Sequence, residues 1–403
     1  MLSFFKKGIY KDSFLNIVAS LILTAAVQLL AYPFLGRQFS VSDYGLILMI
    51  MGIINAIGVS LGNSLNNTRI LLQAEYEKKG FHGDYNPIFL GISIVGAITV
   101  AVITTIVLKK IDVTVIGSIV ITLLILIRAY YSASFRININ YNKVLMSNLF
   151  GLFGYLFGII ITYFTGLWVF LFIFGELFSC IYILNTSKIV RDKFQITSLF
   201  KKSFNKFFFI MSASVLSTMM MYMDRFYIYP FLGAEEVSAY TVASYLGKTA
   251  GIIFIPIAGV LLTYYAKEDE LKIREFYKRT SLFVLCSFVI YIGIITLGIP
   301  ITKLLYPTII NDAIPYFNIA NLAAIVFILG NTIQPTLLRY CEAKWPPIIQ
   351  GVYFIVYLIL GYYGMIHYGL LGFCYAILIS NIFQVIFMLI TVTVSLHKKI
   401  VIL

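Results

Sequence analysis

Five ionisable side chains lie within long apolar segments of this sequence: Arg128, Glu176, Asp224, Arg225 and Lys248. An ionisable group at membrane depth is costly, so it usually faces a bundle interior or a water-filled cavity. The three cations could bind an anion, and the acids could bind a proton or a sodium ion. These residue types therefore indicate a polar path through an apolar molecule.

Arg128 and Glu176 each allow two interpretations. Ser132 and Arg136 follow Arg128 at helical spacing, so the three side chains form one stripe. This stripe favours a cationic opening to a cavity, although an arginine about two turns from a helix end can also snorkel or cap a neighbouring helix. Glu176 lies centrally in its segment, where it is either a neutral acid that joins two helices or a coupling-ion site.

Asp224, Arg225 and Lys248 follow in the second half of the chain. Adjacent helical residues point about 100° apart, so Asp224 and Arg225 either face separate partners or neutralise one another. Lys248 shares a helical face with Ser244 and other small or polar residues. Close helix packing explains small residues, but it does not explain a lysine at mid-membrane, so we predict that Lys248 faces a cavity.

Neutral polar residues extend this predicted cavity lining. Gln28 ends a run of polar residues at spacing four, and Ser217 and Arg225 occupy the corresponding ridge later in the chain. Asn55 begins a second face of small and polar residues. We predict that these side chains line the cavity: Gln28, Asn55, Ser217 and Ser244.

Composition identifies the molecule that must position these residues. Hydrophobic residues form 60% of the 403-residue chain and charged residues only 12%, whereas a soluble domain has roughly 25% charged residues. Apolar stretches follow one another nearly end to end, and each span needs about 20 such residues. We predict an all-α polytopic membrane protein with twelve transmembrane helices, over residues 13–35, 44–65, 86–108, 113–135, 144–164, 167–187, 207–232, 237–265, 280–299, 315–338, 346–364 and 369–394.

The basic residues predict the orientation of these spans. Most lysines and arginines fall in alternate links, and the other links hold only Arg37, Lys109, Lys110 and Lys303. Cytoplasmic loops carry the excess of basic residues, so we expect both termini to be cytoplasmic in a multi-pass membrane protein. The net charge of +13 then faces anionic membrane lipid, and no basic domain exists for nucleic acid.

A repeat predicts how the spans are grouped. Tyr-Pro-Phe-Leu-Gly occurs at 32–36 and again at 229–233, nearly half the chain apart. Two similar halves of a membrane protein often place a substrate path between them. We therefore predict two related six-helix bundles around a central cavity, at 1–187 and 207–403, joined by a basic cytoplasmic linker at 188–206.

The usual signatures of enzymes and metal sites are missing from the sequence. The four cysteines are far apart and lack ligand spacing. We find no P-loop, Rossmann fingerprint or nucleophile elbow. We predict no enzyme activity, no metal and no cofactor apart from a coupling proton or sodium ion.

The sequence resembles the multidrug/oligosaccharidyl-lipid/polysaccharide (MOP) superfamily, and within it the O-antigen and capsule repeat-unit flippases of Wzx type. The resemblance rests on two stretches, 32–45 and 223–240. The second contains an Asp-Arg pair followed by Leu-Gly-Ala-Glu-Glu-Val and a tyrosine. The predicted layout of twelve spans extends the likeness over the whole chain.

The resemblance implies a multi-pass protein of the bacterial plasma (inner) membrane, in which two bundles alternate access to a central cavity. It implies transport of an undecaprenyl-diphosphate-linked oligosaccharide to the outer leaflet, for O-antigen, lipopolysaccharide, capsule or other polysaccharide biosynthesis. On this chain Arg128, Arg225 and Lys248 would bind the substrate, and Asp224 and Glu176 would couple to an ion gradient. Besides lipid-linked oligosaccharide and membrane lipid, polysaccharide polymerase or chain-length proteins are candidate partners.

Three other functions fit less of the sequence. An ion-coupled small-molecule (multidrug) antiporter of the same superfamily is the alternative, although such exporters often bind cations and the bases here outnumber the acids. A major-facilitator transporter usually carries a Gly-x-x-x-Asp-Arg-x-Gly-Arg pattern, which the link after the second span lacks. A polymerase, ligase or membrane glycosyltransferase usually needs a large outer loop, and every predicted outer link is short.

Overall fold

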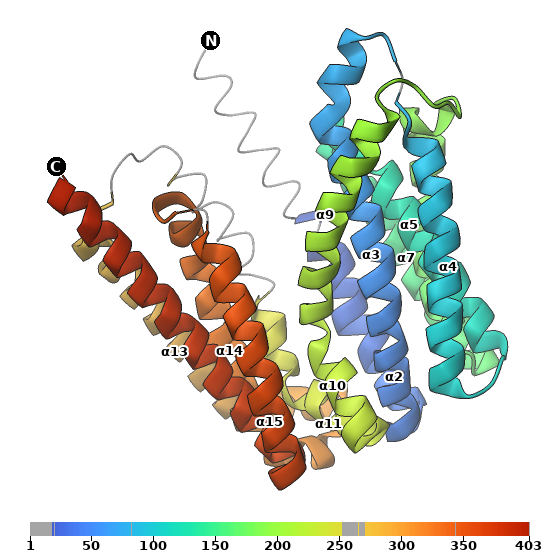
Figure 1. The fold of residues 1–403 in the computed structure, drawn as a ribbon. Helices are drawn as coiled ribbons and strands as arrows, with labels where there is room; N and C mark the ends of the chain where they lie inside the picture. The colour runs from blue at the N-terminus through green and yellow to red at the C-terminus, as the bar shows by residue number, and fades with distance from the viewer. Residues whose placement is uncertain are drawn as a thin grey trace. The chain divides into compact units, whose positions relative to one another are not determined.

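A computed structural model of the chain describes residues 18–19, 21–81, 83–251, 265, 271–342 and 344–402, with side chains up to His397. All regular elements in these residues are helices (Figure 1). The chain divides into two compact units: unit 1 is Met1–Gln38 with Leu46–Tyr227, and unit 2 is Phe39–Gly45 with Ile228–Leu403. The predicted linker at 188–206 therefore belongs to unit 1 by its contacts, while the assignment of six spans to each half stays a prediction.

Unit 1 is built mainly from long helices joined by short turns. Its described elements are η1 (Ala26–Ala31), α2 (Tyr32–Gln38), α3 (Val41–Lys78) from Leu46 onward, α4 (Tyr85–Leu108), α5 (Val113–Tyr131), α6 (Ala133–Ile137), α7 (Tyr141–Thr165), α8 (Val169–Thr186), η2 (Lys188–Arg191), α9 (Phe200–Met221) and the first half of α10 (Met223–Leu232).

The described residues of unit 2 include three long helices. Its elements are the start of α3, the remainder of α10, α11 (Ala234–Ala243), α13 (Ile273–Leu305), α14 (Ile310–Tyr340) and α15 (Trp345–Ile402). Gly369 has φ 58° and ψ −146° within α15, a left-handed backbone that glycine adopts readily. The predicted spans 346–364 and 369–394 are therefore two arms of α15 on either side of Gly369.

Nine helices of the described residues are long and apolar enough to cross a membrane. They include α15, which holds two predicted spans. Spans 13–35 and 237–265 lie partly outside the described residues. The total of twelve spans and the cytoplasmic termini stay predictions.

Helices extend into two of the predicted links. Helix α3 has 38 residues, which at about 1.5 Å per residue exceeds the roughly 30 Å hydrocarbon core. The residues from Arg69 to Lys78, predicted as a link, continue this helix because Arg69, Leu72 and Tyr76 are buried against the rest of unit 1. Similarly, α9 begins at Phe200, within the predicted linker 188–206.

Glycines let the helices of unit 1 approach closely. A Cβ added at Gly154 of α7 would lie 2.3 Å from the Phe174 carbonyl oxygen of α8. On α3, a Cβ at Gly62 would lie 2.6 Å from the Ala129 Cβ of α5. Such small residues allow membrane helices to pack through their backbones. Part of the α3 face that we predicted to line a cavity therefore packs against α5.

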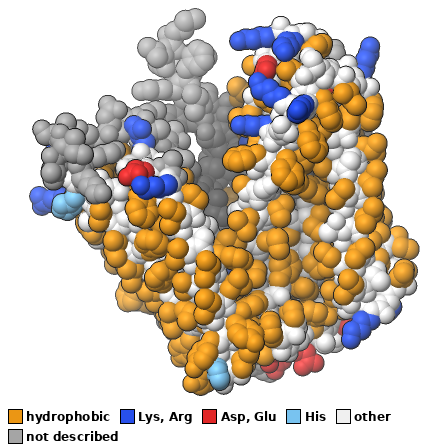
Figure 2. All heavy atoms as spheres, viewed as in Figure 1, with side chains coloured by type: hydrophobic (Ala, Val, Ile, Leu, Met, Phe, Trp, Pro, Cys, Tyr) orange, Lys and Arg blue, Asp and Glu red, His pale blue; other side chains and the backbone are white. Residues whose placement is uncertain are grey.

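Hydrophobic side chains cover the long sides of the unit 1 helices, while most visible lysines and arginines of this unit lie near helix ends (Figure 2). Exposed apolar residues are numerous on α4, including Ile94, Val95 and Ile98. In water such a surface would be unfavourable, whereas in a bilayer it faces hydrocarbon. This distribution agrees with a protein that crosses the membrane many times.

Candidate functional site

Arg128 and Glu176 form an ion pair between α5 and α8. The Arg128 Nε donates to Glu176 Oε2 at 2.5 Å, and its Nη2 donates to Oε1 at 3.3 Å. The Glu176 side chain is 5% exposed and the Arg128 side chain 25% exposed. Bidentate contacts of this kind are among the stronger hydrogen bonds in proteins. Two residues that we predicted to act separately therefore neutralise one another in this conformation.

Tyr155 of α7 completes this group, and we call Arg128, Tyr155 and Glu176 the charged junction. The Tyr155 hydroxyl donates to Glu176 Oε1 at 3.2 Å. Gly175, the residue before Glu176, makes room for the Tyr155 ring, which would lie 2.6 Å from a Cβ at that position. The junction thus joins three helices through one buried carboxylate.

Arg225 lies in a second buried group of unit 1. It is 8% exposed, and its Nη1 donates to the Leu48 carbonyl oxygen of α3 at 3.1 Å. Its guanidinium carbon lies 5.3 Å from the centre of the Tyr222 ring and 6.0 Å from that of Tyr32. The neighbouring Asp224 is also buried, at 6% exposed. Arg225 is therefore held by a backbone carbonyl and by two aromatic faces.

An aromatic cluster of Tyr32, Phe172 and Tyr155 connects Arg225 with the charged junction. The Tyr32 and Phe172 ring centres are 6.0 Å apart, and Phe172 and Tyr155 are 6.2 Å apart. Arg225 lies over the Tyr32 ring, and Tyr155 bonds to Glu176. The fold therefore brings three of our predicted charged residues, Arg128, Glu176 and Arg225, together through one aromatic cluster, and Asp224 lies buried in the same unit.

Sequence reasoning missed the three members of this aromatic cluster. The sequence did offer one signal, since Tyr32 begins the repeated Tyr-Pro-Phe-Leu-Gly that we used only to detect duplication. Tyr155 and Phe172 offered no signal, because aromatic residues are common throughout the chain. Their contacts depend on how α2, α7 and α8 pack.

Lys248, the third predicted cation, belongs to unit 2. It is exposed, and its Nζ lies 4.9 Å from the centre of the Tyr240 ring. Ser244, one turn earlier, is buried and donates to the Tyr240 carbonyl oxygen at 2.9 Å. The cation–π contact fixes the direction of the lysine side chain. Its predicted role as a cavity cation stays a prediction.

The other predicted cavity residues have modest local contacts. Gln28 on η1 is half-buried, and Ser217 on α9 is exposed. Asn55 of α3 donates to the Met51 carbonyl oxygen of its own helix at 2.8 Å. Nothing in these contacts assigns them a ligand, and their place in a cavity lining stays a prediction.

Unit 2 contains a neutral junction, made by Ala323, Tyr353 and Asn381. The Tyr353 hydroxyl donates to Asn381 Oδ1 at 2.9 Å, and Asn381 Nδ2 donates to the Ala323 carbonyl oxygen at 2.8 Å. These residues lie in the tenth, eleventh and twelfth predicted spans, as Arg128, Tyr155 and Glu176 lie in the fourth, fifth and sixth. The last span of each half thus contacts a tyrosine of the preceding span and a residue of the span before that.

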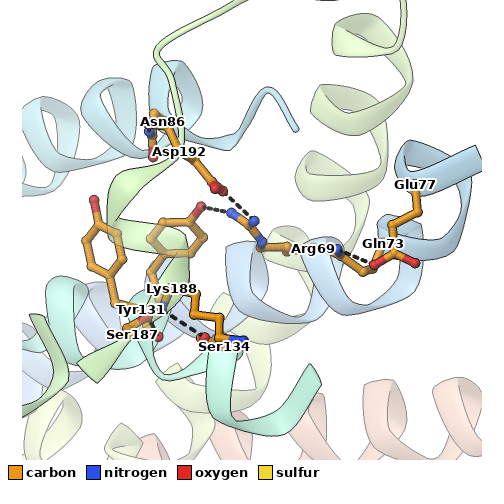
Figure 3. Close-up of polar contacts among 10 residues, drawn as sticks. Arg69, Gln73, Glu77, Asn86, Tyr131, Ser134, Ser187, Lys188 and Asp192 are labelled. Atoms are coloured by element: carbon orange, nitrogen blue, oxygen red, sulfur yellow. Dashed lines mark hydrogen bonds and ion pairs between the residues drawn. The ribbon is translucent and has the colours of Figure 1, made fainter. Parts of the chain in front are cut away.

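A separate polar cluster surrounds Arg69, which we counted only as a positive charge of an inner link. Arg69 is 3% exposed, and its Nη1 donates to the Tyr130 hydroxyl at 2.9 Å. Its Nη2 forms an ion pair with Asp192 at 2.5 Å. Asn86, which lies beside Asp192 in Figure 3, donates to the Asp192 carbonyl oxygen at 2.8 Å.

Asp192 lies in the predicted basic linker, 188–206, and Asp84 holds this linker at a second point. This carboxylate is fully buried and accepts hydrogen bonds from the Tyr76 hydroxyl at 2.7 Å and from the Thr197 backbone N–H and hydroxyl, both at 2.6 Å. Ser203 is also bonded to Tyr76, at 2.6 Å. The basic linker is therefore docked on the ends of the unit 1 helices.

The described residues contain no group of three or more His, Cys, Asp or Glu side chains that could hold a metal ion. The buried carboxylates Glu176 and Asp84 of unit 1 are instead bonded to arginine, tyrosine or threonine partners. The chemistry that these groups offer is recognition of charge and transfer of protons.

Comparison with known proteins identifies the fold. The sequence matches no family model and no curated protein. Among solved structures, the chain is similar to a lipid II flippase MurJ in an inward closed conformation, with a TM-score of 0.70 and 16% identity over 97% of this chain and 87% of that one.

The chain is also similar to multidrug transporters. An inward-facing multidrug resistance MATE family transporter of the MOP superfamily gives a TM-score of 0.65 and 14% identity, over 96% of this chain and 95% of that one. The Vibrio cholerae MATE transporter VcmN in the bent form gives 0.57 and 15%, over 98% and 97%. The chain therefore has the fold of MOP-superfamily transporters.

Proposed function

We propose that the protein is a flippase that moves an undecaprenyl-diphosphate-linked oligosaccharide from the inner to the outer leaflet of the bacterial plasma membrane. The observation that carries this proposal is the placement of two arginines, the partly exposed Arg128 and the buried Arg225, beside one aromatic cluster within unit 1. The fold is shared with a lipid II flippase. Alternating access of two units would deliver the repeat unit for polysaccharide assembly outside the membrane.

The physical need for such a protein follows from the substrate. A diphosphate and its sugars cannot enter hydrocarbon without losing strong hydration. Guanidinium groups replace that hydration because they present several donors to phosphate oxygens. On this proposal Arg128, Arg225 and Lys248 bind the anionic group, and the aromatic rings of Tyr32 and Phe172 keep Arg225 and the charged junction in place.

An ion-coupled small-molecule antiporter is the second candidate, and two observations favour it. The chain covers 95% of a MATE transporter but 87% of MurJ. Unit 1 also buries two acids within its predicted spans, Glu176 and Asp224, which could bind a cationic drug or a coupling ion. Both candidates use alternating access on one fold, so the substrate must be tested directly.

Deletion of the gene distinguishes the two candidates. We expect the deletion strain to lose its surface glycan and to accumulate lipid-linked repeat units at the inner leaflet. A normal surface glycan without a substitute transporter would contradict the flippase. Increased sensitivity to cationic drugs with a normal glycan would favour the antiporter.

Complementation then tests the predicted cations. We expect Arg128→Ala, Arg225→Ala and Lys248→Ala to impair translocation at normal protein levels. Lys193→Ala is the matched control, because Lys193 is an exposed cation of the docked linker. Full complementation by all three variants would show that these cations do not bind the substrate.

A further inference from the structure

We propose that the charged junction is an anion-exchange site. An anionic group of the transported molecule displaces Glu176 from Arg128, and the released carboxylate takes up one proton. This inference rests on the proposed function, because it takes the transported molecule to be anionic. On this inference, substrate binding by Arg128 and proton uptake by Glu176 are two parts of one exchange.

The exposure of the two partners sets the order of events. Arg128 keeps 25% of its side chain exposed, whereas Glu176 keeps 5%. An incoming anion can therefore contact Arg128 while Glu176 remains enclosed by α5, α7 and α8. A guanidinium has five donors, and here two of them are used by Glu176. The remaining donors can contact the anion before the ion pair opens.

The released carboxylate has few partners that could keep its charge. Among the described residues, the ionisable side chains around it are Arg128 from α5, Tyr155 from α7 and Cys180 from α8, with Tyr32 of α2 beside Tyr155. The Cys180 thiol is already directed to the Leu124 carbonyl oxygen. Once Arg128 binds another anion, the Tyr155 hydroxyl is the one described donor that Glu176 still has. A buried charge without a counter-ion becomes neutral, so Glu176 gains a proton.

Charge is conserved at the junction during this exchange. Before the exchange, the Arg128 guanidinium balances the Glu176 carboxylate. After it, Arg128 balances one negative charge of the incoming anion, and Glu176 is neutral. The proton binds with the anion and leaves with it, so both move in the same direction. A diphosphate still carries net negative charge after this uptake, and an inside-negative potential drives that charge outward.

The neutral junction of unit 2 argues that these charges serve more than packing. Neutral hydrogen bonds of 2.9 and 2.8 Å connect Tyr353 and Asn381, on the two arms of α15, with each other and with Ala323 of α14. These three segments are the tenth to twelfth predicted spans, which correspond to the fourth to sixth. A buried ion pair is often no more stabilising than a well-packed neutral group. Unit 1 therefore uses a charged pair where a neutral group is sufficient for structure.

The ligand of this site is an oxyanion. A guanidinium binds phosphate and carboxylate with similar two-point geometry, so the anion is either the diphosphate of the lipid or an acidic sugar of its head group. The two sources can be separated with simple probes. Undecaprenyl diphosphate carries only phosphate, and free galacturonic acid carries only a carboxylate.

The test measures binding of each probe to the purified full chain in nanodiscs between about pH 5.5 and 8. Exchange predicts that the Kd of wild type rises about tenfold more per pH unit than that of Glu176→Gln, because one proton is taken up on binding. Glu176→Gln should also bind more tightly than wild type at the higher pH, since its competing carboxylate is absent. The double variant R128Q/E176Q should bind the anion at least tenfold more weakly than Glu176→Gln.

Two controls keep this result interpretable. R128Q/E176Q removes both charges, as in the neutral junction, and its size-exclusion profile and unfolding temperature report its folding. Tyr353→Phe alters the neutral junction, so its pH dependence should match that of wild type.

Three results would contradict the exchange. Equal pH dependence for wild type and Glu176→Gln would rule out the coupled proton while leaving the flippase proposal intact. Equal affinity of a folded R128Q/E176Q and Glu176→Gln would rule out Arg128 as the anion site. If wild type binds neither undecaprenyl diphosphate nor galacturonic acid, both the exchange and the proposed substrate are contradicted.

Discussion

Arg128 and Glu176 lie 48 residues apart in the sequence, yet each is the other's main partner. Removal of one partner leaves an uncompensated charge, which is far more costly than removal of both. The contribution of this pair to stability is therefore visible only when single and double variants are compared.

We expect Arg128→Met to destabilise the protein by about 3 kcal/mol, at the lower end of the range for buried pairs because Arg128 is partly exposed. The double variant R128M/E176Q should recover most of this loss, since it buries no charge. The measurement is the free energy of unfolding in detergent at neutral pH. A double variant less stable than Arg128→Met would mean that Glu176 has another stabilising partner.

At the scale of elements, glycines determine how closely α7 and α8 approach. A Cβ at Gly175 would lie 2.6 Å from the Tyr155 ring, so that ring or the helix must move. We expect Gly175→Ala to lower stability by about 1–3 kcal/mol. The control is Gly351→Ala in α15, where no atom lies within 4 Å of the added Cβ. In this control, the higher helix propensity of alanine should stabilise the protein by up to about 1 kcal/mol. Thermal unfolding of both variants checks this prediction. An equal loss of stability in Gly175→Ala and Gly351→Ala would contradict the role of close packing at Gly175.

The docked linker is also a property of elements, since it connects α8 to α9. Asp84 accepts two hydrogen bonds from Thr197, and bonds to a charged group contribute about 1.5–3 kcal/mol each. We expect Asp84→Ala to increase local opening of the linker at least tenfold, a change that limited trypsin digestion at Lys193 and Lys201 should detect. Glu75→Ala removes an exposed ion pair with Lys202 and should change digestion little. Similar digestion of wild type and Asp84→Ala would show that the linker is held elsewhere.

At the scale of the whole molecule, the distribution of lysine and arginine predicts the orientation in the membrane. We expect Lys303→Cys to react with a membrane-impermeant maleimide added outside intact cells. Lys193→Cys should react only after the membrane is permeabilised. The background is a variant in which Cys286 and Cys341, the more accessible of the four free cysteines, are changed to Ser. The reverse pattern of labelling would invert the predicted topology.

Composition and charge were sufficient to identify a multi-span helical membrane protein, because burial in lipid leaves strong one-dimensional signals. Apolar stretches must be long enough to cross the bilayer, and their backbones must be bonded internally. Helix boundaries were less predictable: Arg69 and Tyr76 look like link residues in the sequence, but partners on α4, on α5 and in the linker bury them.

The sequence alone determined which residues were worth attention at the site: Arg128, Glu176, Asp224, Arg225 and Lys248. Their chemical type and their apolar surroundings are local properties, so no fold was needed to find them. Tertiary structure decided their partners. The pairing of Arg128 with Glu176, the part played by Tyr155 and the burial of Arg69 against Asp192 depend on the register between helices. That register is set by close packing at positions such as Gly154, Gly175 and Gly62, and contacts of this kind between distant residues leave no periodic signal along the chain.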